Sequence, residues 1–405
     1  MLSLAIRFLL AGLSICSFLL IAEDDNGLSA YKSGNFEAAI PLLQNAVSKS
    51  PNDALLQAAL LSSLVYEGRV DQAFDADEHD ATALPDSPEV LAARGEFAFY
   101  MGDMPQAEKL FRAAIKIKEA TPRAVYGLSR LYRAASFYRA ARLACMRARQ
   151  IDEDDALIMQ AWLRYAFPQK RQELLGPFAA AHPWLYKHYD QGRESSAAVR
   201  KATENRKIFE PDGPPQPVTL HLLKLLRNPN SPRGVGLELR IDGGRPLRML
   251  FDTGASGIVV KQSAIDKAEL EHLGSGESWG IGDKGVRNSF AAVASTCQVS
   301  TLKFKTCVIE ALEGKGRIAG DEDGLIGADF FSDYVVTLDF EKSLMHLEPL
   351  PPRPADPQGY DRSVPPEESQ FTPVFRFGHS LLVSTKVNER CTGLFLLDTG
   401  AGLSN

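Results

Sequence analysis

The sequence predicts a solenoid of α-helices followed by an all-β domain. In the first part of the chain, a glycine-containing pattern recurs every 34 residues. Near Pro211, glycine and proline become frequent, and apolar residues begin to alternate with polar ones. The second part contains two copies of a strand that leads into Asp-Thr-Gly. These three observations divide the chain into parts with different folds, and the candidate chemistry falls in the second part.

The 34-residue pattern lies within residues 27–160. Copies begin at Gly34, Gly68 and Gly102, and a degenerate fourth copy, Ala135–Ala140, falls one residue short of the register. The glycine suits the left-handed conformation that ends a helix. The alanine five residues later is small enough for two helices to pack closely. The pattern resembles the tetratricopeptide repeat family, which implies stacked helix pairs. Residues 161–215 are expected to form a helical connector and linker.

The predicted solenoid has two interpretations. Stacked helix pairs present a concave surface that could bind a protein or peptide partner. The alternative is a spacer that holds the following domain in place, because nothing in the repeats identifies a ligand.

The first 22 residues differ from the rest of the chain. Arg7 precedes an uncharged, mainly apolar run that ends at Ala22, and Glu23 opens a polar region. This pattern predicts a secretory signal peptide, and therefore an exported protein that is periplasmic or secreted. The cleavage site is weak because Leu20 stands where a small residue is preferred. The alternative is an uncleaved N-terminal membrane anchor that leaves the protein outside the cytoplasm.

Composition narrows the classes of partner. The 405 residues include 45 basic and 51 acidic side chains, a formal net charge of −6, which argues against a nucleic-acid partner. The seven histidines are scattered without metal-ligand spacing, so we expect neither a metal nor another cofactor. Cys297 and Cys307 lie in strand-like sequence, where they either pair in an oxidising compartment or remain buried thiols.

Residues 216–350 have the pattern of a β domain. Apolar residues alternate from Val235 to Ile241, and Asp242-Gly243 predicts a tight hairpin turn. A second strand, residues 247–251, leads directly into Asp252-Thr253-Gly254-Ala255. Further short strands are expected at 290–295, 303–311 and 334–339.

The loop at Asp252 resembles the active-site signature of retropepsin-like and pepsin-like aspartyl proteases. About seventy residues later, Leu325-Ile326-Gly327 resembles the segment that braces this loop in the family. The glycine-rich stretch between them, with Trp279, Gly280 and Gly282, matches the position of the family's flap. The resemblance implies that Asp252 is catalytic and that Thr253 hydrogen-bonds to the partner loop. Gly254 permits a sharp turn and close backbone approach, and Ala255 is small enough to leave room for the substrate.

A second copy of the signature follows a proline-rich linker at residues 351–370. Residues 371–405 repeat strand, turn and strand before Asp398-Thr399-Gly400. The sequence stops seven residues after Asp398, so we interpret the second unit as truncated. Aspartic proteases need two adjacent carboxyl groups that share a proton. We therefore expect Asp252 to pair with Asp398; without a second unit, two copies would pair as a homodimer.

The predicted function is hydrolysis of peptide bonds in a peptide or protein by water that the two aspartates activate. The alternative is a non-catalytic scaffold in which the repeats bind a partner and the β domain is a remnant.

One acidic stretch, with Asp321, Glu322, Asp323 and Asp329, fits no calcium loop and is interpreted as a solvated turn.

Overall fold

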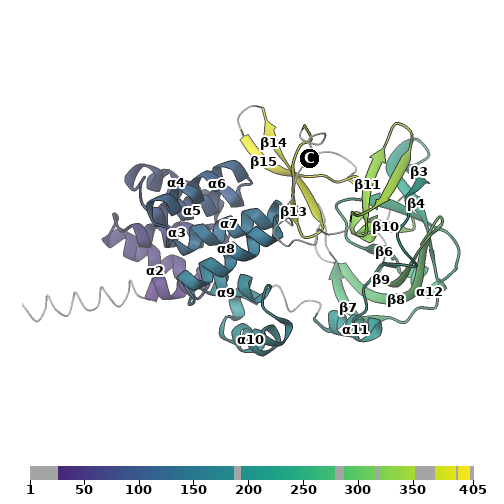
Figure 1. Cartoon of the computed structure of the whole chain (residues 1–405), viewed down its shortest axis with the longest axis horizontal. Helices are drawn as coiled ribbons and strands as arrows, with labels where there is room; N and C mark the ends of the chain where they lie inside the picture. Colours follow the sequence, from purple (N-terminus) through teal and green to yellow (C-terminus); the bar gives the residue numbers. More distant parts are fainter. Residues whose placement is uncertain are drawn as a thin grey trace, which may run out of the picture. The chain divides into compact units, whose positions relative to one another are not determined.

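The computed structural model describes residues 26–186, 193–278, 287–314, 320–351, 370–388 and 391–401. The chain divides into two compact units (Figure 1). The first unit comprises Met1–Lys187 with Asp356–Phe375 and Ser384–Phe395, and the second comprises the remaining segments. In the described residues no helix has the length and apolar character needed to cross a membrane. The predicted signal peptide, residues 1–22, and nearly all of the proline-rich linker lie outside the described residues.

The first unit is built from antiparallel helix pairs. A helix over residues 26–32 precedes the following: α2 Phe36–Lys49, α3 Ala54–Tyr66, α4 Val70–Ala83, α5 Pro88–Tyr100, α6 Met104–Ile117, α7 Pro122–Ala134, α8 Tyr138–Ile151, α9 Ala156–Leu163, α10 Pro168–Ala181 and the 3₁₀-helix η1 Pro183–Tyr186. From α2 to α9, every second helix begins 34 residues after its predecessor. Figure 1 shows the pairs stacked beside one another, as in a tetratricopeptide solenoid.

The turn between the two helices of each pair explains the repeated glycine. Gly34, Gly68 and Gly102 all have positive φ angles, between 66° and 80°, which cost glycine little. The structure corrects the fourth copy, which keeps the 34-residue register. Ser136 takes the glycine position with φ 67°, and the buried alanine is Ala141. The sequence pattern was misread because a serine tolerates the left-handed conformation here.

Small residues bring the helices together. The four alanines at equivalent positions are at most 1% exposed: Ala39, Ala73, Ala107 and Ala141.

A buried charge cluster joins α5, α7 and the N-terminus of α9. The Arg123 guanidinium donates to Asp155 at 2.5 Å and to Glu96 at 3.4 Å, and both carboxylates are buried. Such a cluster is stable only while opposite charges remain paired.

The second unit contains a closed β-sheet. After α11 (Arg193–Thr203), its strands are β1 Glu210–Pro211, β2 Val218–His221, β3 Leu223–Asn228, β4 Ser231–Ile241, β5 Leu247–Asp252, β6 Ile258–Lys261, β7 Leu273–Ser278, β8 Arg287–Val299, β9 Leu302–Leu312, β10 Gly324–Gly327, β11 Tyr334–Asp339 and β12 Leu344–Pro349. Helix α12 (Gln262–Lys267) follows β6, and the 3₁₀-helix η2 (Ala328–Phe331) follows β10. The main order is β9-β6-β10-β5-β4-β8, and β8 pairs with β9, so the sheet closes on itself. Strands β11, β12 and β2 form a separate sheet.

The barrel is filled by large apolar side chains. Phe251, Phe304 and Phe330 are almost completely buried in one cluster, together with aliphatic residues of β4, β6 and β9. Cys297 and Cys307 also lie in this core, where the structure has them as free thiols. Burial of these residues is the main stabilising contribution to the unit.

Two hairpins and one three-stranded sheet lead into or border the candidate site. The turn between β4 and β5 has positive φ at Asp242 and Gly243, as a tight hairpin requires. Strands β7 and β8 pair with Ser278 opposite Arg287. The residues predicted to form the flap, Trp279, Gly280 and Gly282, lie outside the described residues. The last segment forms a three-stranded sheet from β13 (Val374–Phe377), β14 (Ser380–Val387) and β15 (Cys391–Leu396).

Candidate functional site

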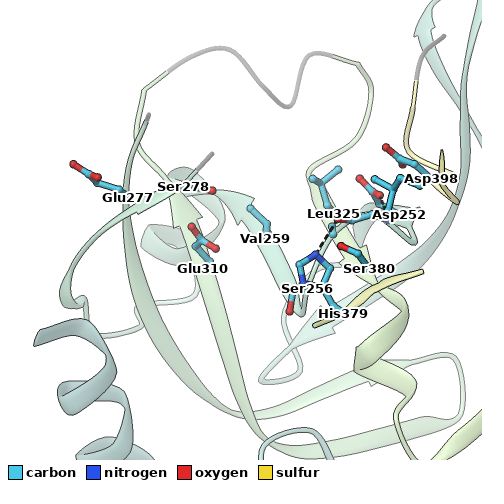
Figure 2. Close-up of a pocket in the computed structure, with 13 residues that line it drawn as sticks. Asp252, Ser256, Val259, Glu277, Ser278, Glu310, Leu325, His379, Ser380 and Asp398 are labelled. Atoms are coloured by element: carbon cyan, nitrogen blue, oxygen red, sulfur yellow. Dashed lines mark hydrogen bonds between the residues drawn. The ribbon is translucent and has the colours of Figure 1, made fainter. Parts of the chain in front are cut away.

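The two Asp-Thr-Gly loops meet in the second unit. Asp252 is the last residue of β5, and Asp398 follows β15 by two residues. In each loop the glycine amide donates to the aspartate of the same loop, from Gly254 to Asp252 at 2.8 Å and from Gly400 to Asp398 at 2.7 Å. The two carboxyl groups lie next to each other (Figure 2). The structure therefore brings together two aspartates that are 146 residues apart in the sequence.

Crossed hydrogen bonds hold the two loops together. The Thr253 hydroxyl donates to the carbonyl of Leu397 at 2.6 Å, and the Thr399 hydroxyl donates to the carbonyl of Phe251 at 2.7 Å. Each threonine oxygen also accepts the backbone amide of the other threonine, at 3.1 Å in both directions. This pattern has approximate twofold symmetry. It fixes the two loops, and therefore both carboxyl groups, without ordering any side chain other than the two threonines.

The glycines of the loops allow this close approach. A methyl group at Gly254 would lie 3.0 Å from the Asp398 carboxyl carbon. A methyl group at Gly400 would overlap the Asp252 carboxylate. A larger residue at either position would push the opposite carboxyl group away.

Strand β10 braces the first loop from behind. Its residues Leu325, Ile326 and Gly327 pair in parallel with β5, and Gly327 stands opposite Asp252. The same strand pairs antiparallel with β6, so the first loop is fixed from two sides. Both apolar side chains are buried, and Leu325 also lines the cavity at the two carboxyl groups.

The interpretation of the acidic residues near β10 as a solvated turn holds only for Asp321, which is exposed, and it is wrong for Glu322, Asp323 and Asp329. Asp329 accepts the Ser256 hydroxyl at 2.6 Å and the Gly257 amide at 2.7 Å, and it thereby fixes the loop that follows the first signature. Asp323 accepts the Arg248 amide at 3.0 Å. Their partners are distant in the sequence, so the linear acidic pattern could not reveal these roles.

A buried ion pair supports the second loop. Arg233, on β4, donates to the carbonyl of Gly400 at 2.6 Å and to the Glu322 carboxylate at 3.3 Å. Glu322 is only 1% exposed, and its backbone carbonyl accepts the Lys261 ammonium at 2.7 Å. Sequence analysis missed Arg233, which belongs to no recognised motif, and it placed Glu322 in a solvated acidic stretch, an interpretation that the burial of Glu322 corrects.

The environment favours a protonated carboxyl group. Burial raises the pKa of Asp252 to about 6, and the adjacent negative charge and hydrogen-bonding partner Asp398 act in the same direction. The Gly254 amide and the Arg233 charge act in the opposite direction. The raised pKa of Asp252 therefore reflects both its burial and its neighbour Asp398.

A cavity of about 450 Å³ opens at the two carboxyl groups (Figure 2). It is lined by Asp252, Gly254, Ala255, Ser256, Val259, Glu277, Ser278, Glu310, Leu325, His379, Ser380, Leu396 and Asp398. His379 comes from the turn before β14, and its Nε2 lies 3.1 Å from the carbonyl of Gly254, to which it donates. The sequence offered no signal for His379, since a single histidine in a turn matches no motif. Among the described residues, no group of His, Cys, Asp and Glu could hold a metal ion.

Comparison with known proteins gives one family match. Residues 237–330, which include the first signature and β10, match the family model described as aspartyl protease. No match is found among the curated proteins.

Solved structures resemble part of the chain. A thermophilic TPR protein of Thermus thermophilus shares 15% identity, covers 45% of this chain and 97% of its own, and has a TM-score of 0.31. A MamA protein shares 16% identity, covers 42% of this chain and 95% of its own, and has a TM-score of 0.24. The chain combines helix pairs of the tetratricopeptide type with an aspartyl-protease-like β unit.

Proposed function

We propose that this protein is an aspartic endopeptidase in which Asp252 and Asp398 together activate a water molecule. The observation that carries the proposal is the pair of adjacent carboxyl groups at the base of a cavity. The hydrogen bonds of Thr253 and Thr399 hold the two loops that carry them. Burial and the adjacent Asp398 raise the pKa of Asp252 to about 6, so the pair retains one proton in mildly acidic solution.

The shared proton defines the reaction steps. The ionised carboxylate accepts a proton from water as the water oxygen attacks the carbonyl carbon of the peptide bond. The protonated carboxyl group donates to the carbonyl oxygen, which becomes a hydroxyl in the tetrahedral intermediate. Collapse of that intermediate breaks the carbon–nitrogen bond: the departing nitrogen takes the proton that the first carboxyl group accepted from water, and one hydroxyl of the intermediate returns its proton to the other carboxylate as the carbonyl re-forms. Both carboxyl groups return to their starting protonation state.

The remaining parts of the proposal concern context. We assign the helix pairs to docking of a substrate or another protein, because stacked pairs of this type form extended binding surfaces. We assign the protein to an exported compartment, on the basis of the apolar N-terminal run. Export of the full chain fused to a reporter, compared with a chain lacking residues 1–22, tests that assignment.

The test of the activity uses the full chain and a library of quenched fluorogenic peptides at pH 4–7. We expect cleavage that a statine-type inhibitor blocks. Asp252→Asn and Asp398→Asn should each lower kcat/KM by about 10²–10⁴-fold, the usual contribution of a general acid or base. Asp266→Asn, an exposed change on α12, is the matched control and should retain activity. Cleavage that persists in Asp252→Asn, or absence of cleavage by the wild-type chain, rejects the proposal; the latter favours a non-catalytic scaffold.

A further inference from the structure

The cavity extends beyond the two carboxyl groups along an apolar wall. Val259 on β6 and Leu325 on β10 form this wall and belong to one buried apolar cluster with Leu250. Strands β6 and β10 pair directly, with Val259 opposite Leu325, so the wall is continuous and rigid. An aliphatic chain of a substrate residue can therefore lie against it.

A carboxylate stands at the end of this wall. Glu310 on β9 pairs in register with Val259, so the two residues are neighbours on parallel strands. Figure 2 shows the Glu310 side chain near Val259 and Ser278, on the opposite side of the cavity from Asp252 and Asp398. Glu277, which is exposed, lies at the rim beyond it.

Within the described residues, no cation lines this side of the cavity. Neither lysine nor arginine lines the cavity among the residues that the structure describes. Over the same residues, no hydrogen bond or ion pair reaches the Glu310 or the Glu277 carboxylate. A half-buried carboxylate next to an apolar wall favours a cation, whereas an apolar substrate side chain would remove water from it without providing a partner.

We propose that this part of the cavity binds a lysine or arginine side chain of the substrate beside the scissile bond, with Glu310 as the residue that determines specificity. The inference rests on the proposed peptidase function. The methylene groups of the bound side chain pack on Val259 and Leu325, and its cationic group pairs with Glu310. The substrate class is therefore a peptide or protein with a basic residue next to the cleaved bond.

The experiment compares two peptides that differ at one position. One carries lysine beside the scissile bond, and the other carries norleucine, which has the same aliphatic chain without the ammonium group. We expect the full chain to cleave the lysine peptide with a kcat/KM at least about tenfold higher, as a charge-assisted hydrogen bond provides. Glu310→Gln should lower cleavage of the lysine peptide so that the ratio falls to about one. Cleavage of the norleucine peptide should not decrease, because the variant removes the cost of desolvating the Glu310 charge, and this retained cleavage also shows that the variant folds.

Two further variants complete the design. Glu277→Gln should reduce the ratio less, because this side chain is exposed at the rim. Glu348→Gln changes an exposed glutamate of β12 outside the cavity and should keep the wild-type ratio. Equal cleavage of both peptides by the wild-type chain overturns the inference and leaves the peptidase function standing. Cleavage of neither peptide overturns both, and a preference for lysine that survives Glu310→Gln overturns the assignment of Glu310.

Discussion

Replacing one carboxyl group of the pair should stabilise the folded protein at neutral pH. The folded state holds the pKa of Asp252 at about 6, against an ordinary value of 3.8, chiefly through burial and the neighbouring Asp398. This difference corresponds to about 3 kcal/mol at 1.36 kcal/mol per pKa unit. Asparagine keeps the oxygen that accepts the Gly254 amide but carries no charge. Asp252→Asn is therefore expected to raise the free energy of unfolding at pH 7 by up to about 3 kcal/mol.

The pH dependence has a defined sign. Because its folded-state pKa is raised, Asp252 binds a proton more tightly in the folded state than in the unfolded state. Its contribution is therefore most favourable below about pH 4, declines as the pH rises toward 6, and is constant above that. The gain from Asp252→Asn should consequently be large at pH 7 and small at pH 4.

The assay must report on the β unit alone, since the two units need not unfold together. Urea unfolding followed by hydrogen exchange of peptides from β5 and β10 meets this requirement. Asp266→Asn, which changes an exposed carboxylate on α12, should leave the unfolding free energy nearly unchanged. If Asp252→Asn is no more stable than the wild type at pH 7, burial does not penalise the charged form as we have argued.

Three other changes test the supports of the site and of the helical unit. Arg233→Met should shift the pH–activity profile of the proposed peptidase to higher pH, because the arginine charge lowers the pKa of Asp252. The same change should lower kcat/KM about tenfold or more, because Arg233 also holds the second loop. Arg227→Met, on the exposed surface of β3, is the control. Gly400→Ala should reduce activity by about a hundredfold because its methyl group overlaps the opposite carboxylate, whereas Gly393→Ala, which has open space, should retain it. Arg123→Met leaves two buried carboxylates unpaired and should destabilise the helical unit by about 3–5 kcal/mol, measured by thermal unfolding at 222 nm.

The features that depend on neighbouring residues could be read in the sequence. The 34-residue pattern predicted helix pairs, since each copy carries its own turn and small packing residue. The fourth copy shows the limit of this reasoning. Ser136 hides the register in the sequence, and only its left-handed backbone and the burial of Ala141 reveal it.

The contacts that depend on distant residues could not be read in this way. Arg233 and Glu322 support the second loop across 89 residues of sequence, and neither matches a motif. Asp329 looked like part of a solvated acidic stretch, although it accepts two hydrogen bonds from the loop after the first signature. His379, in the turn before β14, and Glu310, on β9, both line the cavity, and no spacing in the sequence relates them.

The sequence by itself determined the helix-pair repeat, the alternation of the strands and the two Asp-Thr-Gly turns, because backbone propensity and side-chain periodicity act over a few residues. The tertiary structure alone decided the contacts that no motif predicts: the arginine beneath the second loop and the carboxylate at the far end of the cavity. Those relations arise when the sheet closes on itself, since closure brings strands from distant parts of the chain into contact and sets the burial that controls each charge.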